Sequence, residues 1–197
     1  MNLETISSYV SNSILTFTKC FLFDNTTYTE ERNTNSNSAL IRISEATKYD
    51  YEKDEIRRAV TYERGPLGFM NNGTLGDHVD VNGSRIGLNA TMIEGSAVLN
   101  CMSASLYEAE DLAGLLSMAF LAFRQQFVDR FNRFHDITPI AIGSTTSIIH
   151  SGGADDLVHV PVSLRYQLSI GWLADATRQA IHNKTIIDLQ NGIRTLS

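Results

Sequence analysis

Residues 96–134 read SAVLNCMSASLYEAEDLAGLLSMAFLAFRQQFVDRFNRF, and this stretch decides the fold. Small and apolar residues up to Met102 predict a strand, and the segment from Ser105 to Phe134 predicts one long helix. Ser105 and Glu108 have the spacing of a capping box. In that motif the serine hydroxyl accepts the backbone N–H of Glu108, and the Glu108 carboxylate accepts the N–H of Ser105.

This helix is too apolar for an ordinary surface helix. A stripe with helical spacing predicts the face that packs in the core: Ala109, Leu112, Ala113, Leu116, Phe120, Phe123, Phe127 and Phe131. Leu115, Met118 and Ala122 extend the apolar character well beyond that stripe. We therefore expect these three residues to be covered either by an N-terminal helix or by a neighbouring subunit.

The rest of the chain predicts an α+β fold, in which a mixed or antiparallel β-sheet packs against the central helix, about residues 105–134. Apolar residues with helical spacing predict a helix over 2–22 that packs on it. Alternation over Val158–Gly171 predicts a long strand with one buried and one polar face. Residues 85–93 and 96–102 predict two strands joined by a turn at Glu94-Gly95. We expect residues 1–197 to form a single domain.

Glycine is frequent in the segment GPLGFMNNGTLGDHVDVNGSRIG, which predicts a long loop or interaction arm at about residues 65–87. Asn82-Gly83 within it suits the turn of a hairpin. Phe69 and Met70 are the apolar side chains that such an arm would present. After Trp172 the sequence is weakly patterned, and we expect a C-terminal tail.

Composition limits the classes of function. The formal net charge is -6 and no basic run occurs, which argues against sequence-independent binding to nucleic acid. The two cysteines, Cys20 and Cys101, form no CxxC pair, so we expect reduced thiols. The N-terminus lacks the features of a signal peptide and no apolar run is long enough to span a membrane. We expect the chain to be made in the cytoplasm.

No familiar catalytic motif is present. The sequence lacks a P-loop, GxGxxG and GxSxG. Asp77, His78 and Asp80 bring candidate metal ligands together, but strand alternation would send Asp77 to one face and the other two to the opposite face. Because a metal site usually needs three or four convergent ligands, we expect no metal, no cofactor and no catalytic residue.

Three ordered motifs resemble the tail terminator and neck (head–tail joining) proteins of tailed bacteriophages: GSAVLNCMS at 95–103, YEAEDLA at 107–113 and VPVSLRYQ at 160–167. The resemblance spans about residues 85–172. It implies a virion subunit that forms a ring, typically of six copies, at the head–tail junction. Such a ring ends the tail tube and joins it to the head connector, and DNA passes through its lumen without specific binding. The family has no catalytic residues.

The resemblance gives the apolar residues a role. Leu115, Met118, Ala122 and Trp172 become candidates for the subunit interface, and Phe69, Met70, Asp77 and His78 for an arm that reaches an adjacent ring. Two other interpretations remain open. One is a small cytoplasmic enzyme with a site around Asp77, His78 and Asp80, and the other is a cytoplasmic homo-oligomeric binding module.

Overall fold

A computed structural model describes residues 3–26, 28–30, 40–48, 58–70, 75–81, 84–148 and 157–174. Their elements are α1 (Leu3–Asn25), β1 (Thr29–Glu30), β2 (Leu40–Glu45), the 3-10 turn η1 (Ala46–Lys48), β3 (Ala59–Phe69), β4 (Leu75–Val81), β5 (Ser84–Ser103), α2 (Leu106–Ala122), α3 (Arg124–Arg130), β6 (Phe134–Ile142), β7 (Thr146–Ile148) and β8 (Leu157–Ala174). The α+β prediction is confirmed. The chain divides into two compact units, residues 1–68 with 93–168, and residues 69–92 with 169–197.

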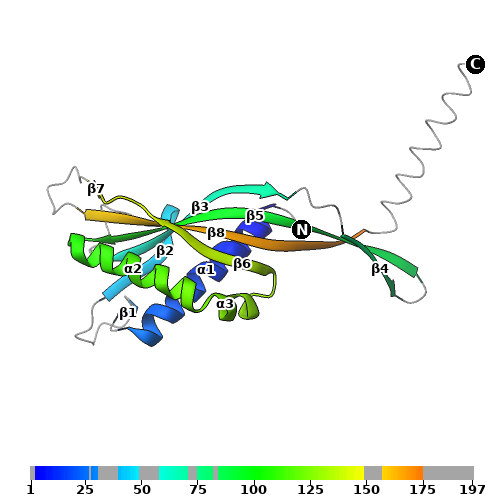
Figure 1. Cartoon of the computed structure of the whole chain (residues 1–197), viewed down its shortest axis with the longest axis horizontal. Coiled ribbons are helices and arrows are strands. Elements are labelled where there is room, and N and C mark those ends of the chain that lie inside the picture. Colours follow the sequence, from blue (N-terminus) through cyan, green and yellow to red (C-terminus); the bar gives the residue numbers. More distant parts are fainter. Residues whose placement is uncertain are drawn as a thin grey trace, which may run out of the picture. The chain divides into compact units, whose positions relative to one another are not determined.

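The strands form a mixed sheet in the order β1-β2-β3-β5-β8-β6, with β4 paired to β5 and β7 paired to β8. The pairs β1–β2 and β2–β3 are parallel, whereas β6 and β7 run antiparallel to β8. In the larger unit, α1, α2 and α3 lie together along one side of these strands (Figure 1). The alternation along β8 is confirmed, since Val160, Val162 and Leu164 are buried and Arg165 is exposed.

Aromatic side chains join the helices to the sheet. Phe17 of α1 packs on Phe120 of α2 and on Phe127 of α3, with ring centroids 4.8 and 5.3 Å apart. Phe127 in turn meets Phe134 of β6 at 4.9 Å, and Phe134 meets Tyr166 of β8 at 5.8 Å. The predicted packing of the N-terminal helix on the central one is therefore present.

The single helix predicted over 105–134 is wrong in its length. Phe123, with φ -107° and ψ 19°, leaves the helical region between α2 and α3, and β6 already begins at Phe134. The break changes the direction of the chain, so that Phe127 is fully buried against Phe17 and Phe134. In an unbroken helix, Phe127 would instead continue the apolar stripe along the axis of α2.

The turn predicted at Glu94-Gly95 is also wrong, because β5 is one continuous strand. Gly95 serves close packing: a Cβ there would lie 2.6 Å from Cε2 of the buried Tyr166 ring. Beside it, Glu94 of β5 accepts a hydrogen bond from Arg165 of β8. The glycine thus lets the ring of Tyr166 approach the β5 backbone, where any side chain would collide with it.

Both prolines near β8 sit where the strand pairing is irregular. Among the described strands β6 ends the sheet order, and its register shifts between Pro139 and Ala141, as an edge position predicts. Pro161 is not at an edge. It lies in β8 where the partner changes from β6 to β7, and its carbonyl accepts the N–H of Gly143 at 2.7 Å. β6 and β7 are accordingly two separate partners of β8.

The segment 65–87 is largely strand, so its prediction as a long loop is wrong. The hairpin predicted there is confirmed by the antiparallel pairing of β4 with β5, and a role as an interaction arm stays a prediction. β3 continues to Phe69, and β4 pairs antiparallel with β5 from Leu75↔Ala90 to Val81↔Ser84. Residues 82–83, which connect the last pair, lie outside the described residues. Ladder hydrogen bonds come from the backbone, so glycines do not prevent this pairing. β8 continues to Ala174, past the predicted start of the tail after Trp172, and residues 175–197 lie outside the described part.

Candidate subunit interface on α2

The core side of α2 contains seven buried residues: Ala109, Leu112, Ala113, Leu116, Ser117, Ala119 and Phe120. They follow the spacing of one helical face, and α1 packs against this side through Phe17. Because each residue turns the helix by about 100°, Met118 lies on the opposite side from this face. Packing in the core therefore leaves one complete side of α2 outward.

That outward side is apolar. The exposed fraction is 78% for Tyr107, 64% for Met118 and 52% for Leu121. Ala122 is exposed too, and Leu115 is half-buried. Coverage of Met118 and Ala122 by α1, one of the two expectations from the sequence, is thereby excluded. The other expectation, coverage by a neighbouring subunit, stays a prediction.

Gly114 lies on the same side, in the middle of α2. A Cβ built on it would meet none of the described atoms within 4 Å, so packing inside this chain does not require a glycine there. A glycine inside a helix costs about 1 kcal/mol relative to alanine. The sequence reasoning missed Gly114, although a lone glycine within an apolar helical pattern is a visible signal.

A second exposed apolar pair lies on β6, which α2 contacts. Ile140 and Ile142 are both more than half exposed, and β6 carries no further strand among those described. Thr145, just after β6, donates a hydrogen bond of 3.3 Å to Glu110 of α2. The sequence did not identify these isoleucines, since an edge strand next to a helix is a property of the fold.

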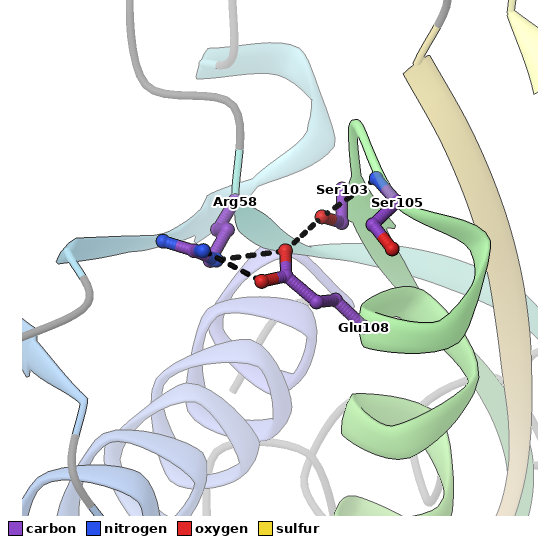
Figure 2. Close-up of polar contacts among 4 residues, drawn as sticks. All are labelled: Arg58, Ser103, Ser105 and Glu108. Atoms are coloured by element: carbon purple, nitrogen blue, oxygen red, sulfur yellow. Dashed lines mark hydrogen bonds and ion pairs between the residues drawn. The ribbon is translucent and has the colours of Figure 1, made fainter.

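A polar cluster fixes the N-terminus of α2 (Figure 2). Arg58, just before β3, donates from Nε to Glu108 Oε2 at 2.9 Å and from Nη2 to Glu108 Oε1 at 2.6 Å. The Ser103 hydroxyl at the end of β5 donates to Glu108 Oε2 at 2.6 Å and accepts the N–H of Ser105 at 3.2 Å. One carboxylate thus joins α2 to two strands.

The predicted capping box is therefore wrong in its bonds. Ser105 is the N-cap residue, but its side chain makes no capping hydrogen bond, and Glu108 turns to Arg58 instead of the Ser105 N–H. A bidentate arginine is a stronger partner for a carboxylate than one amide. The hydrogen bonds from Arg58 and then from Ser103 lower the pKa of Glu108 below its usual value, and Glu108 raises the pKa of Arg58.

A cavity of about 230 Å³ lies between α1 and α3. Its lining comprises Phe17, Cys20, Phe21, Asp24, Asn25, Phe123, Gln126 and Arg130. Arg130 Nη1 lies 3.7 Å from the Cys20 sulfur and its guanidinium is 5.8 Å from the centre of the Phe131 ring. The sequence did not predict this cavity, because its walls come from elements more than 100 residues apart.

The other candidate residues are spread through the fold. Phe69, 67% exposed, ends β3, and the Met70 N–H donates to the Met92 carbonyl at 3.0 Å. Asp77 and His78 are neighbours on β4, in register with Leu88 and Gly87, and their side chains lie outside the described part. Trp172 belongs to β8, and its side chain is likewise not described.

The described residues hold no group of three or more His, Cys, Asp or Glu side chains that could bind a metal ion. Both cysteines are free, and burial raises the pKa of the Cys101 thiol. None of the described helices combines the length and apolar composition needed to cross a membrane. No model of a known protein family matches the chain, and a search of curated proteins finds no significant match.

Proposed function

We propose that this protein is a structural subunit of the bacteriophage head–tail junction. Copies of the chain form a ring, of six as the sequence resemblance implies, that ends the tail tube and joins it to the head connector. The observation that carries the proposal is the apolar outward face of α2, which α1 leaves uncovered. The resemblance of residues 85–172 to head–tail joining proteins supports the head–tail junction as the part of the virion where the copies assemble.

The energetics of this face favour assembly over a free subunit. Burial of a side chain such as Met118 or Leu121 contributes about 1.5–3 kcal/mol relative to full exposure. Tyr107 and the half-buried Leu115 would add to that contribution. Such a face is typical of a surface that another protein surface completes.

The negative net charge of the chain is consistent with a ring whose lumen DNA passes through. The formal net charge is -6. Phosphate binding requires clustered lysine and arginine, and a negative surface repels the DNA backbone instead. A ring of this subunit would therefore let DNA slide without holding it.

Immunogold electron microscopy tests the proposal. Antibodies raised against the purified chain would be applied to phage particles from a lysate that contains the protein, with antibodies against a capsid protein as the control. We expect label at the joint between head and tail. Particles that carry label elsewhere, or lack the protein altogether, would overturn the proposed location.

The cavity between α1 and α3 favours one alternative, a homo-oligomeric binding module. Three phenylalanine rings and the Arg130 guanidinium would suit a small ligand with an apolar body and an acidic group. Thermal-shift measurements with aromatic carboxylic acids test this alternative. A dose-dependent rise in the melting temperature that Arg130→Gln abolishes would support it, and no rise would exclude it for this ligand class.

A further inference from the structure

We propose that the outward face of α2 pairs two copies of this chain, with the two α2 helices antiparallel and in contact at Gly114 and Met118. The pair is a state of the free protein that uses the same face of α2 as the proposed ring, so the two assemblies are alternatives for this face. Its occupant is a second copy, because the face is complementary to itself in both shape and charge.

Shape complementarity follows from the spacing of the outward residues. Tyr107, Asp111, Gly114, Met118 and Leu121 recur at intervals of four and three residues, which is the spacing that forms a seam between two helices. In an antiparallel register centred on residue 116, Met118 of each copy lies against the partner's Gly114. Met118, the largest flexible side chain of the seam, therefore packs against Gly114, its smallest residue, at two symmetry-related positions.

This register gives a reason for the glycine. A Cβ at Gly114 would point into open space among the described residues of its own chain, so alanine there would stabilise the helix. Helix axes in contact lie 8–10 Å apart, and the separation depends on the side chains at the contact. A glycine opposite a methionine lets the helices approach while the methionine side chain is buried.

Charge selects the antiparallel orientation. The acidic residues Glu110 and Asp111 lie near the N-terminal end of α2, whereas Arg124, which forms an ion pair with Asp136 of its own chain, begins α3 beyond the C-terminal end of α2. Antiparallel packing places Asp111 opposite the partner's Leu121 and far from the partner's Asp111. Opposite ends of the two helix dipoles then also lie together. Parallel packing would set carboxylate against carboxylate.

The size of the face sets the strength of the pair. α2 has 17 residues, so the seam is about 25 Å long. One helix pair buries less than the roughly 1,200–2,000 Å² of a standard stable interface. We therefore expect a dissociation constant on the order of micromolar. A two-fold contact closes on itself, so paired copies cannot grow into filaments.

Sedimentation equilibrium over a range of concentrations tests the pair. For the wild type we expect the mass to rise from the 21.9 kDa of one chain to twice that value. Gly114→Arg should fill the notch and weaken the pair at least tenfold. Asn12→Arg, on the exposed side of α1, is the matched control and should pair like the wild type. Circular dichroism checks that both variants are folded.

Crosslinking tests the register. Gly114→Cys and Met118→Cys proteins, each also carrying Cys20→Ser, are oxidised separately and as a mixture. The mixture should give more covalent dimer than either protein alone, because only a pair of unlike copies brings a cysteine at position 114 of one chain against a cysteine at position 118 of the other. A wild type that stays monomeric, or a Gly114→Arg protein that pairs normally, would overturn the inference. Rings of six in the free wild-type protein would overturn the pair and support the proposed ring, because a two-fold contact at α2 occupies the face that a ring interface would need.

Discussion

Replacement of Glu108 by glutamine should lower stability because one carboxylate joins three elements. Glu108 of α2 accepts two hydrogen bonds from Arg58 and one from Ser103. Glutamine has a similar shape but no charge, and it offers one acceptor oxygen in place of two. The Glu108→Gln protein therefore keeps the fold and loses the ion pair, together with the charge that favours the helix N-terminus.

The magnitude follows from the exposure of the pair. The Arg58 and Glu108 side chains are about one-third exposed, so solvent screening limits the ion pair to about 0.5–1 kcal/mol. Loss of the charge at the helix N-terminus adds about 0.3–1 kcal/mol. We expect a total loss of about 1–2 kcal/mol in the free energy of unfolding, which lowers the melting temperature of a chain this long by about 2–8 °C.

Urea unfolding at several pH values measures this loss, with Glu110→Gln as the control in the same turn. Because the pKa of Glu108 is lowered in the folded state, its stabilisation is complete above the unfolded pKa. It disappears as the pH falls through the folded value. The difference between wild type and Glu108→Gln should therefore be constant near neutral pH and shrink below about pH 4. Equal effects of both variants, or a difference that persists in acid, would refute the reasoning.

Three further substitutions test the packing by urea unfolding. Gly95→Ala should cost about 1–3 kcal/mol, because its Cβ collides with the buried Tyr166 ring, whereas Gly114→Ala in open space should stabilise monomeric protein by about 0.4–1 kcal/mol. Equal effects of these two variants would contradict the assigned contacts. Phe127→Ala should cost about 3–5 kcal/mol, since the ring is fully buried among other aromatic rings, and a loss below 1 kcal/mol would refute that placement. Tyr166→Phe should leave stability unchanged or raise it by up to about 1–3 kcal/mol, because the hydroxyl is buried with no hydrogen-bond partner among the described residues. Burial raises the Tyr166 pKa to about 12, and a large loss of stability in Tyr166→Phe would show that the hydroxyl is bonded.

Local periodicity predicted the parts of the fold that local forces determine. The alternation along β8 and the helical spacing of α1 each reflect one buried face, so Val160, Val162 and Val10 fell where expected. In these segments each residue reports directly on which side of its own element is buried.

The errors occurred where a distant residue decides the local structure. Gly95 was taken for a turn, but its role is to make room for Tyr166, which lies 71 positions further along the chain. The capping box failed because Arg58, 50 positions earlier, binds Glu108. The break at Phe123 places Phe127 against Phe17 of another helix. None of these partners is visible in the local pattern.

The candidate interface was partly visible in the sequence. The helix has more apolar residues than one buried face requires, and the additional ones are Leu115, Met118 and Ala122. The structure leaves Met118 and Ala122 exposed. Ile140 and Ile142 became apparent only once the direction of each face was known. The amount of apolar surface can be read from composition and spacing, but its location requires the tertiary structure.

Hydroxyl-radical footprinting of Met118 is the most direct test of the claim that another copy covers the outward face of α2. Met118 is 64% exposed in one chain, and the fully buried Met102 serves as the internal reference. We predict that oxidation of Met118 falls as the protein concentration rises, while Met102 stays protected throughout. Equal oxidation of Met118 at every concentration would contradict the account.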